Sequence, residues 1–140
     1  MKNKQMKMLF RHADMFRRDL KVRGQVDKVL PNIVRDITDK FGLEFKEDIG
    51  LYASHKERAS ITAYTLGEAL QEAFPNAKIG LKEDHRDSVK TKDWLDYPQS
   101  YRNIKGGLDS LEDTVSVAVS HEPNTRKFNV YRNLDYVIVD

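Results

Sequence analysis

The sequence predicts an α+β fold in which two or three N-terminal helices pack on a mostly antiparallel C-terminal sheet. Two observations lead to this class. Apolar residues recur at helical spacing in the first half of the chain, whereas in the second half they alternate with polar residues as in strands. A chain of 140 residues, of which 39% are hydrophobic, is long enough for one core, so we expect a single domain over residues 1–140.

The first segment, residues 1–24, is expected to be a basic helical arm that extends from the body. Met8, Met15 and Phe16 lie near helical spacing over about residues 4–22, and Gly24 is a natural stop. Eight lysines and arginines but only two acidic residues lie in this segment, while the chain beyond residue 40 is mildly acidic. The side chains expected to form the basic surface are Lys4, Lys7, Arg11, Arg17, Arg18, Lys21 and Arg23.

Two further helices are predicted in the first half of the chain. The apolar stripe of residues 26–41 keeps its helical spacing through Pro31, so we expect one helix that continues past the proline and stops at the following glycine. Ser54 and Glu57 have the spacing of a capping box, in which the serine is the N-cap of the next helix. That helix has a mostly small apolar face over residues 59–73.

The second half is predicted to supply the strands. Residues 77–82 alternate between apolar and polar, and residues 114–120 show the clearest alternation, with the valines expected in the core and Ser116 on a solvated face. Residues 128–131 follow a turn and are expected to pair back with residues 114–120 as a hairpin. Residues 136–139 are almost continuously apolar, which indicates a strand covered on both faces.

The composition excludes several classes of protein. No apolar run approaches the roughly 18–20 residues of a membrane-spanning helix, and we expect no secretory signal. The chain has no cysteine, which excludes disulfide bonds and thiolate zinc sites. We therefore expect an intracellular, cytoplasmic protein, or a component of a virion, without a membrane span.

No group of residues has the spacing of a known catalytic or metal site. No two of the four histidines are four residues apart, so there is no helical metal pair. His85 with Asp84 and Asp87 is the best local candidate for a hard cation, but it lacks the ordered ligand spacing of a calcium loop. We therefore expect a solvated polar loop there, and no metal, cofactor or catalytic residue in the chain.

Three functions are compatible with these patterns. The first is a non-enzymatic structural subunit that docks into a homo-oligomer or larger assembly, as viral head or tail subunits do by analogy, because opposite charges are segregated along the chain. The alternative is a protein that binds DNA or RNA through the basic N-terminal helix. The third is an enzyme that acts on phosphate-containing substrates, with His85, His121 and nearby acidic residues.

Overall fold

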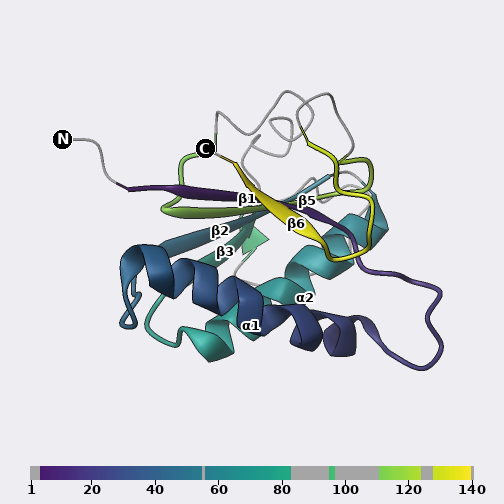
Figure 1. The fold of residues 1–140 in the computed structure, drawn as a ribbon, viewed down its shortest axis with the longest axis horizontal. Coiled ribbons are helices and arrows are strands. Elements are labelled where there is room, and N and C mark those ends of the chain that lie inside the picture. Colours follow the sequence, from purple (N-terminus) through teal and green to yellow (C-terminus); the bar gives the residue numbers. More distant parts are fainter. Residues whose placement is uncertain (1–3, 55, 83–94, 97–110, 124–127, 140) are drawn as a thin grey trace.

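A mixed sheet with two helices on one face forms the structure (Figure 1), a computed structural model that describes residues 4–54, 56–82, 95–96, 111–123 and 128–139. The α+β class predicted from the sequence is confirmed. The described elements follow one another as β1 (Met6–Arg11), α1 (Val22–Phe41), β2 (Asp48–Ala53), α2 (Glu57–Ala73), β3 (Lys78–Lys82), β4 (Leu95–Asp96), β5 (Val115–Ser120) and β6 (Tyr136–Val139).

The strands lie in the order β4-β3-β2-β5-β1-β6, and the sheet is mostly parallel, so the predicted antiparallel arrangement is wrong. Within the described residues, only β6 runs antiparallel to its neighbour, β1. A helix separates β1 from β2 and β2 from β3, and such crossovers connect parallel strands. Both crossovers step across the sheet in the same direction, so their shared handedness puts α1 and α2 on the same face (Figure 1).

The N-terminal segment forms β1 and a loop, so the predicted helical arm is wrong. β1 lies between β5 and β6, where Met8 and Phe10 point into the core under the helices and Leu9 packs on the opposite face. A strand inside a sheet is covered on both faces, which accounts for an apolar run without clear alternation. The residues expected to form one basic surface are instead distributed over β1, its flanks and the first turn of α1.

Both predicted central helices are present, with one change at a helix start. α1 runs through Pro31 and is capped by Gly42, whose φ of 98° suits glycine and whose N–H donates to the carbonyl of Thr38. The N-cap of α2 is Lys56, without a side-chain cap, so the predicted capping box is wrong. The hydroxyl of Ser54 is instead 2.9 Å from a ring nitrogen of His121.

The strand β5 is buried on both faces because it lies at the centre of the sheet. Val117 is in the core with Ile33 and Leu70, as predicted, but Ser116 is also fully buried, so its predicted solvated face is wrong. β1 flanks β5 on one side and β2 on the other. No edge of β5 is left for residues 128–131, so the predicted hairpin is wrong as well.

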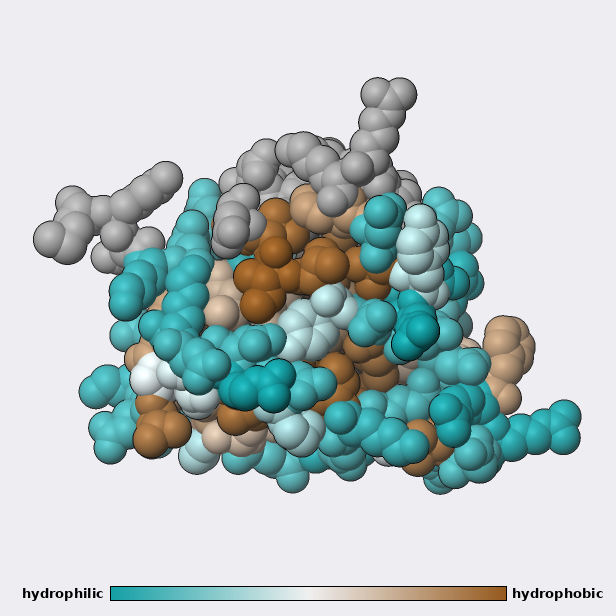
Figure 2. All heavy atoms as spheres, in the orientation of Figure 1, coloured by the Kyte–Doolittle hydropathy of each residue, from teal (hydrophilic) through white to brown (hydrophobic). Residues whose placement is uncertain are grey.

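The edge strand β6 lies on the face of the molecule shown in Figures 1 and 2. Hydrophobic side chains gather at the middle of this face, with hydrophilic side chains around and below them (Figure 2). Ile138 is 44% exposed, so the prediction that residues 136–139 are covered on both faces is wrong. None of the helices in the described ranges has the length and apolar character needed to cross a membrane.

We expect Ile33→Ala and Leu70→Ala each to lower the free energy of unfolding by about 2–5 kcal/mol, because each leaves a cavity between α1, α2 and the sheet. Leu43→Ala removes the same kind of side chain where it is 88% exposed, and we expect it to change stability by less than about 0.5 kcal/mol. Denaturant unfolding measures all three. Equal losses at Leu43 and Leu70 would contradict the described core.

Candidate functional site

Two histidines follow neighbouring parallel strands at the same edge of the sheet. Arg11 ends β1 and is level with Ser120, which ends β5, so that His12 and His121 come next on the two strands. The N–H of His12 donates to the carbonyl of Ser120 at 3.2 Å. Ser54 follows β2, and its hydroxyl reaches Nδ1 of His121. The carboxyl ends of parallel strands are where open α/β sheets bind their ligands.

The imidazole of His12 is held in one tautomer. Its Nδ1 lies 2.6 Å from the carbonyl oxygen of Ala13, which can only accept, so Nδ1 carries the proton and donates. Nε2 is therefore left with a free lone pair. The residue is only 9% exposed, and this burial lowers the pKa of His12 below its ordinary value of 6.5. The Ala13 hydrogen bond raises that pKa, whereas the positive charges of Arg58 and Arg11 lower it further.

Side chains from other parts of the chain fix the backbone that carries this histidine. The N–H of Ala13 donates to the hydroxyl of Thr62 at 2.9 Å, and that hydroxyl donates to the carbonyl of Arg58 at 2.8 Å. The amide of Asn133 donates to the carbonyl of His12 at 2.7 Å. α2 and the turn before β6 therefore both hold the end of β1, which is the rigidity that a reactive side chain requires.

Two arginines lie beside His12, and neither forms an ion pair with a carboxylate of the described residues. The Nε of Arg11 is buried and has no hydrogen-bond partner within the described part of the chain. Arg58, in the first turn of α2, forms no ion pair with any described residue, and the positive end of the helix dipole adds to its charge. A buried donor without a partner costs about 1–3 kcal/mol. An anion between the two guanidinium groups would supply that partner.

A cavity of about 760 Å³ opens next to these groups. Arg11, His12 and Arg58 line it together with Lys56, and Asp14 and Glu57 add two carboxylates. Guanidinium groups bind phosphate oxygens in a bidentate geometry, and a neutral imidazole with a free Nε2 is a nucleophile. The cavity thus brings arginine side chains, an imidazole and two carboxylates together.

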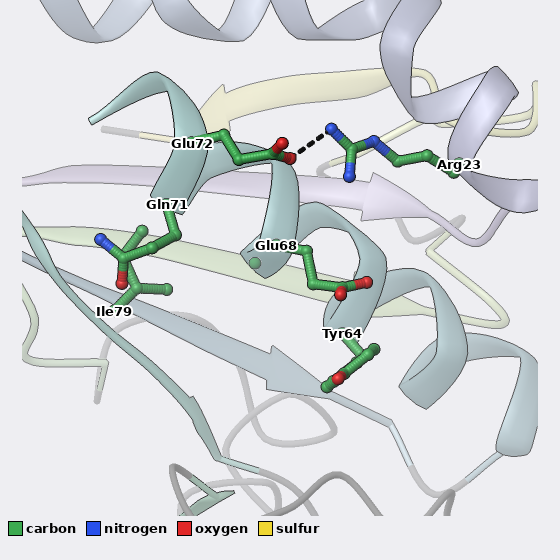
Figure 3. A pocket seen from close by; sticks show the side chains of 7 residues that line it. Arg23, Tyr64, Glu68, Gln71, Glu72 and Ile79 are labelled. Atoms are coloured by element: carbon green, nitrogen blue, oxygen red, sulfur yellow. Dashed lines mark hydrogen bonds and ion pairs between the residues drawn. The ribbon is translucent and has the colours of Figure 1, made fainter. Parts of the chain in front are cut away.

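A second cavity, of about 500 Å³, lies between α2, β3 and the start of α1 (Figure 3). Its one arginine, Arg23, already pairs with Glu72, as the dashed line in Figure 3 shows, and with Asp27. Glu68 adds further negative charge to its wall. This cavity has neither a free cation nor a histidine among its described lining residues, so it is a poorer anion site than the one beside His12.

The residues singled out in the sequence have different fates in the structure. His85, Asp84 and Asp87 lie outside the described residues, and the described residues contain no group of three side chains that could hold a metal ion. Of the basic residues, Arg11 lines the cavity beside His12, whereas Arg17 pairs with Asp19.

Sequence reasoning missed His12 and Arg58 as members of one site, and it placed Arg11 on a basic helix instead of beside His12. A signal was present, since Arg11-His12 directly follows an apolar run and His121 directly follows the clearest strand. Because residues 4–22 were predicted to be a helix, nothing indicated that His12 and His121 follow neighbouring strands at the same edge of the sheet.

Comparisons of the chain with protein-family models, with curated proteins and with solved structures found no match. A proposal for the function therefore depends on the chemistry of the site itself. That chemistry is a neutral histidine beside two arginines at the end of a parallel sheet.

We expect the cavity to bind orthophosphate, and Arg58→Gln to weaken that binding at least tenfold, because a hydrogen bond to a charged group contributes about 1.5–3 kcal/mol. Isothermal titration calorimetry measures the affinity. Arg18→Gln removes the same charge from an exposed position outside the cavity and should leave it unchanged. Equal affinities in the two variants would show that the anion binds elsewhere or by net charge alone.

Proposed function

We propose that the protein is an enzyme that hydrolyses phosphate monoesters through a phosphohistidine on His12. One observation carries the proposal: the Ala13 carbonyl fixes the proton on Nδ1 of His12, so that Nε2 keeps its lone pair, and His12 lines one cavity together with Arg11 and Arg58. A histidine in this state can form a covalent intermediate, and the two guanidinium groups neutralise the charge of the phosphoryl group.

In the first step, Arg11 and Arg58 hold the phosphoryl oxygens and orient the ester for in-line attack. Nε2 of His12 forms a bond to phosphorus, and the bond from phosphorus to the ester oxygen breaks. The departing oxygen needs a proton. Asp14 and Glu57 both line the cavity, and one of these carboxylates relays a proton from solvent to the departing oxygen. The products of this step are the free alcohol and the phosphohistidine.

In the second step, water attacks phosphorus and the bond from phosphorus to Nε2 breaks. The same carboxylate takes a proton from the attacking water and returns it to solvent, so the step yields orthophosphate and neutral His12. The hydrogen bond from Nδ1 to Ala13 persists through both steps and keeps the ring in place. No oxidant, reductant or additional group is consumed.

His121 supports the proposal from the neighbouring strand. Its Nδ1 is 2.9 Å from the hydroxyl of Ser54, and its Nε2 is 3.9 Å from a carboxylate oxygen of Glu122. These contacts hold a second imidazole at the edge of the sheet where β1 ends. In this proposal His121 is a further donor toward the oxygens of the phosphoryl group, which gain charge during the transfer.

The other two functions considered for the chain, docking into an assembly and binding nucleic acid, remain alternative proposals that no finding tests. Both started from a continuous basic helix, and the basic residues are spread over several elements. The enzyme is favoured because His12, Arg11 and Arg58 converge on one cavity although they come from two distant segments.

We expect His12→Ala to lower kcat/KM for phenyl phosphate by about a thousandfold or more, because the nucleophile is removed. In the unsubstituted enzyme, mass spectrometry after rapid alkaline quenching should find one phosphoryl group on His12, since a phosphorus–nitrogen bond survives alkali. His85→Asn is the control and should stay active. A phosphoryl group on any other residue, or full activity of His12→Ala, would refute the mechanism.

The activity should depend on the protonation of His12. Because the pKa of His12 is lowered, the ring stays neutral at neutral pH, and kcat/KM should fall only as the pH drops below 6.5. Arg58→Gln removes a charge that lowers this pKa, so the pKa should rise and the acid limb should move to higher pH. NMR titration of the His12 ring follows the shift directly. If the His12 ring titrates at the same pH in the variant, the charge of Arg58 does not act on the nucleophile.

A further inference from the structure

Apolar as well as charged side chains line the cavity beside His12, and they indicate what the phosphate is attached to. We propose, on the basis of the function proposed above, that the substrate is an aryl phosphate whose aromatic ring packs on Phe16. The cavity of about 760 Å³ is much larger than one phosphoryl group. Its apolar wall consists of Met15, Phe16 and Ile61.

Phe16 is a ring on an anchored backbone. Its side chain lines the cavity and is 92% exposed, so a ligand can bury it. The N–H of Phe16 donates to a carboxylate oxygen of Asp14 at 2.9 Å. Asp14 is itself fixed by Gln25, which accepts from its N–H at 2.9 Å and donates to its carbonyl at 2.8 Å. These hydrogen bonds therefore anchor the backbone that carries the ring.

The charges that remain in the cavity disfavour an anionic leaving group. Once Arg11 and Arg58 are assigned to the phosphoryl group, the remaining charged residues that line it are Lys56, Asp14 and Glu57. One lysine faces two carboxylates, so a second phosphate or a carboxylate on the alcohol would meet net repulsion. A neutral alcohol meets none.

The chemistry of the apolar wall selects an aromatic ring over an aliphatic chain. A phenyl ring stacks in an offset or edge-to-face arrangement on phenylalanine, which adds to the gain from burial alone. The thioether of Met15 also packs favourably against aromatic rings. Since Phe16 lines the same cavity as Arg11 and Arg58, the ring that the apolar wall accepts is expected to be the one that carries the ester oxygen.

Phosphonates test this inference without turnover, because their carbon–phosphorus bond is not hydrolysed. We expect phenylphosphonate to bind about tenfold or more tightly than methylphosphonate, as measured by calorimetry. Phe16→Ala should remove most of that preference and leave methylphosphonate binding unchanged. Phe16→Leu keeps an apolar side chain without a ring and should retain only part of it. Leu43→Ala truncates an equally exposed side chain beyond the end of α1 and should change neither affinity.

The outcomes separate this inference from the function on which it depends. If both phosphonates bind equally well, or if Phe16→Ala weakens both to the same extent, the aryl specificity is refuted while the phosphate site stands. If neither phosphonate binds and phenyl phosphate is not hydrolysed, both proposals are refuted. A free aryl phosphate and a phosphotyrosyl residue present the same ring. Phe16→Ala is therefore assayed with phenyl phosphate and with a phosphotyrosyl peptide. The substrate that loses more kcat/KM is the one that the apolar wall recognises.

Discussion

The parallel pairing of β1 with β5 is the contact on which the rest of the molecule depends. It places Arg11 level with Ser120, and so sets His12 beside the strand that leads into His121. The same β5 pairs with β2 on its other side, which brings Ser54 to this edge and starts α2 nearby. A slip of one residue in this register would turn the apolar side chains of β1 to the wrong faces and carry the site residues with them.

The site combines two requirements that oppose each other. A histidine buried next to two cations is disfavoured in its charged form, which is what the proposed nucleophile needs, but burial also leaves Nε of Arg11 without a partner among the described residues. The backbone at the end of β1 has protein partners, through Thr62 and Asn133. In the proposed function, an anion supplies the partner that Arg11 lacks.

The elements that could be predicted are those with one dominant period. The helix over residues 26–41 and the strand of residues 114–120 have a single apolar pattern, and the structure confirms both. Residues 6–11 are buried on both faces, so their apolar side chains do not alternate and also fit a helix. That error concealed the strand–helix–strand order, and with it the parallel sheet and the meeting of Arg11, His12 and Arg58, which is a property of topology and not of local spacing.

The position of β1 has a consequence for how the chain reaches its native state. β1 is synthesised before the other described strands, but its two neighbours are β5 and β6, with Met6 paired to Val115 and Lys7 to Val139. Contacts so distant in sequence carry a large loop-closure entropy and slow folding. On the ribosome, β1 stays without these partners until β5 and β6 have emerged, and is open to aggregation or to chaperones during that interval.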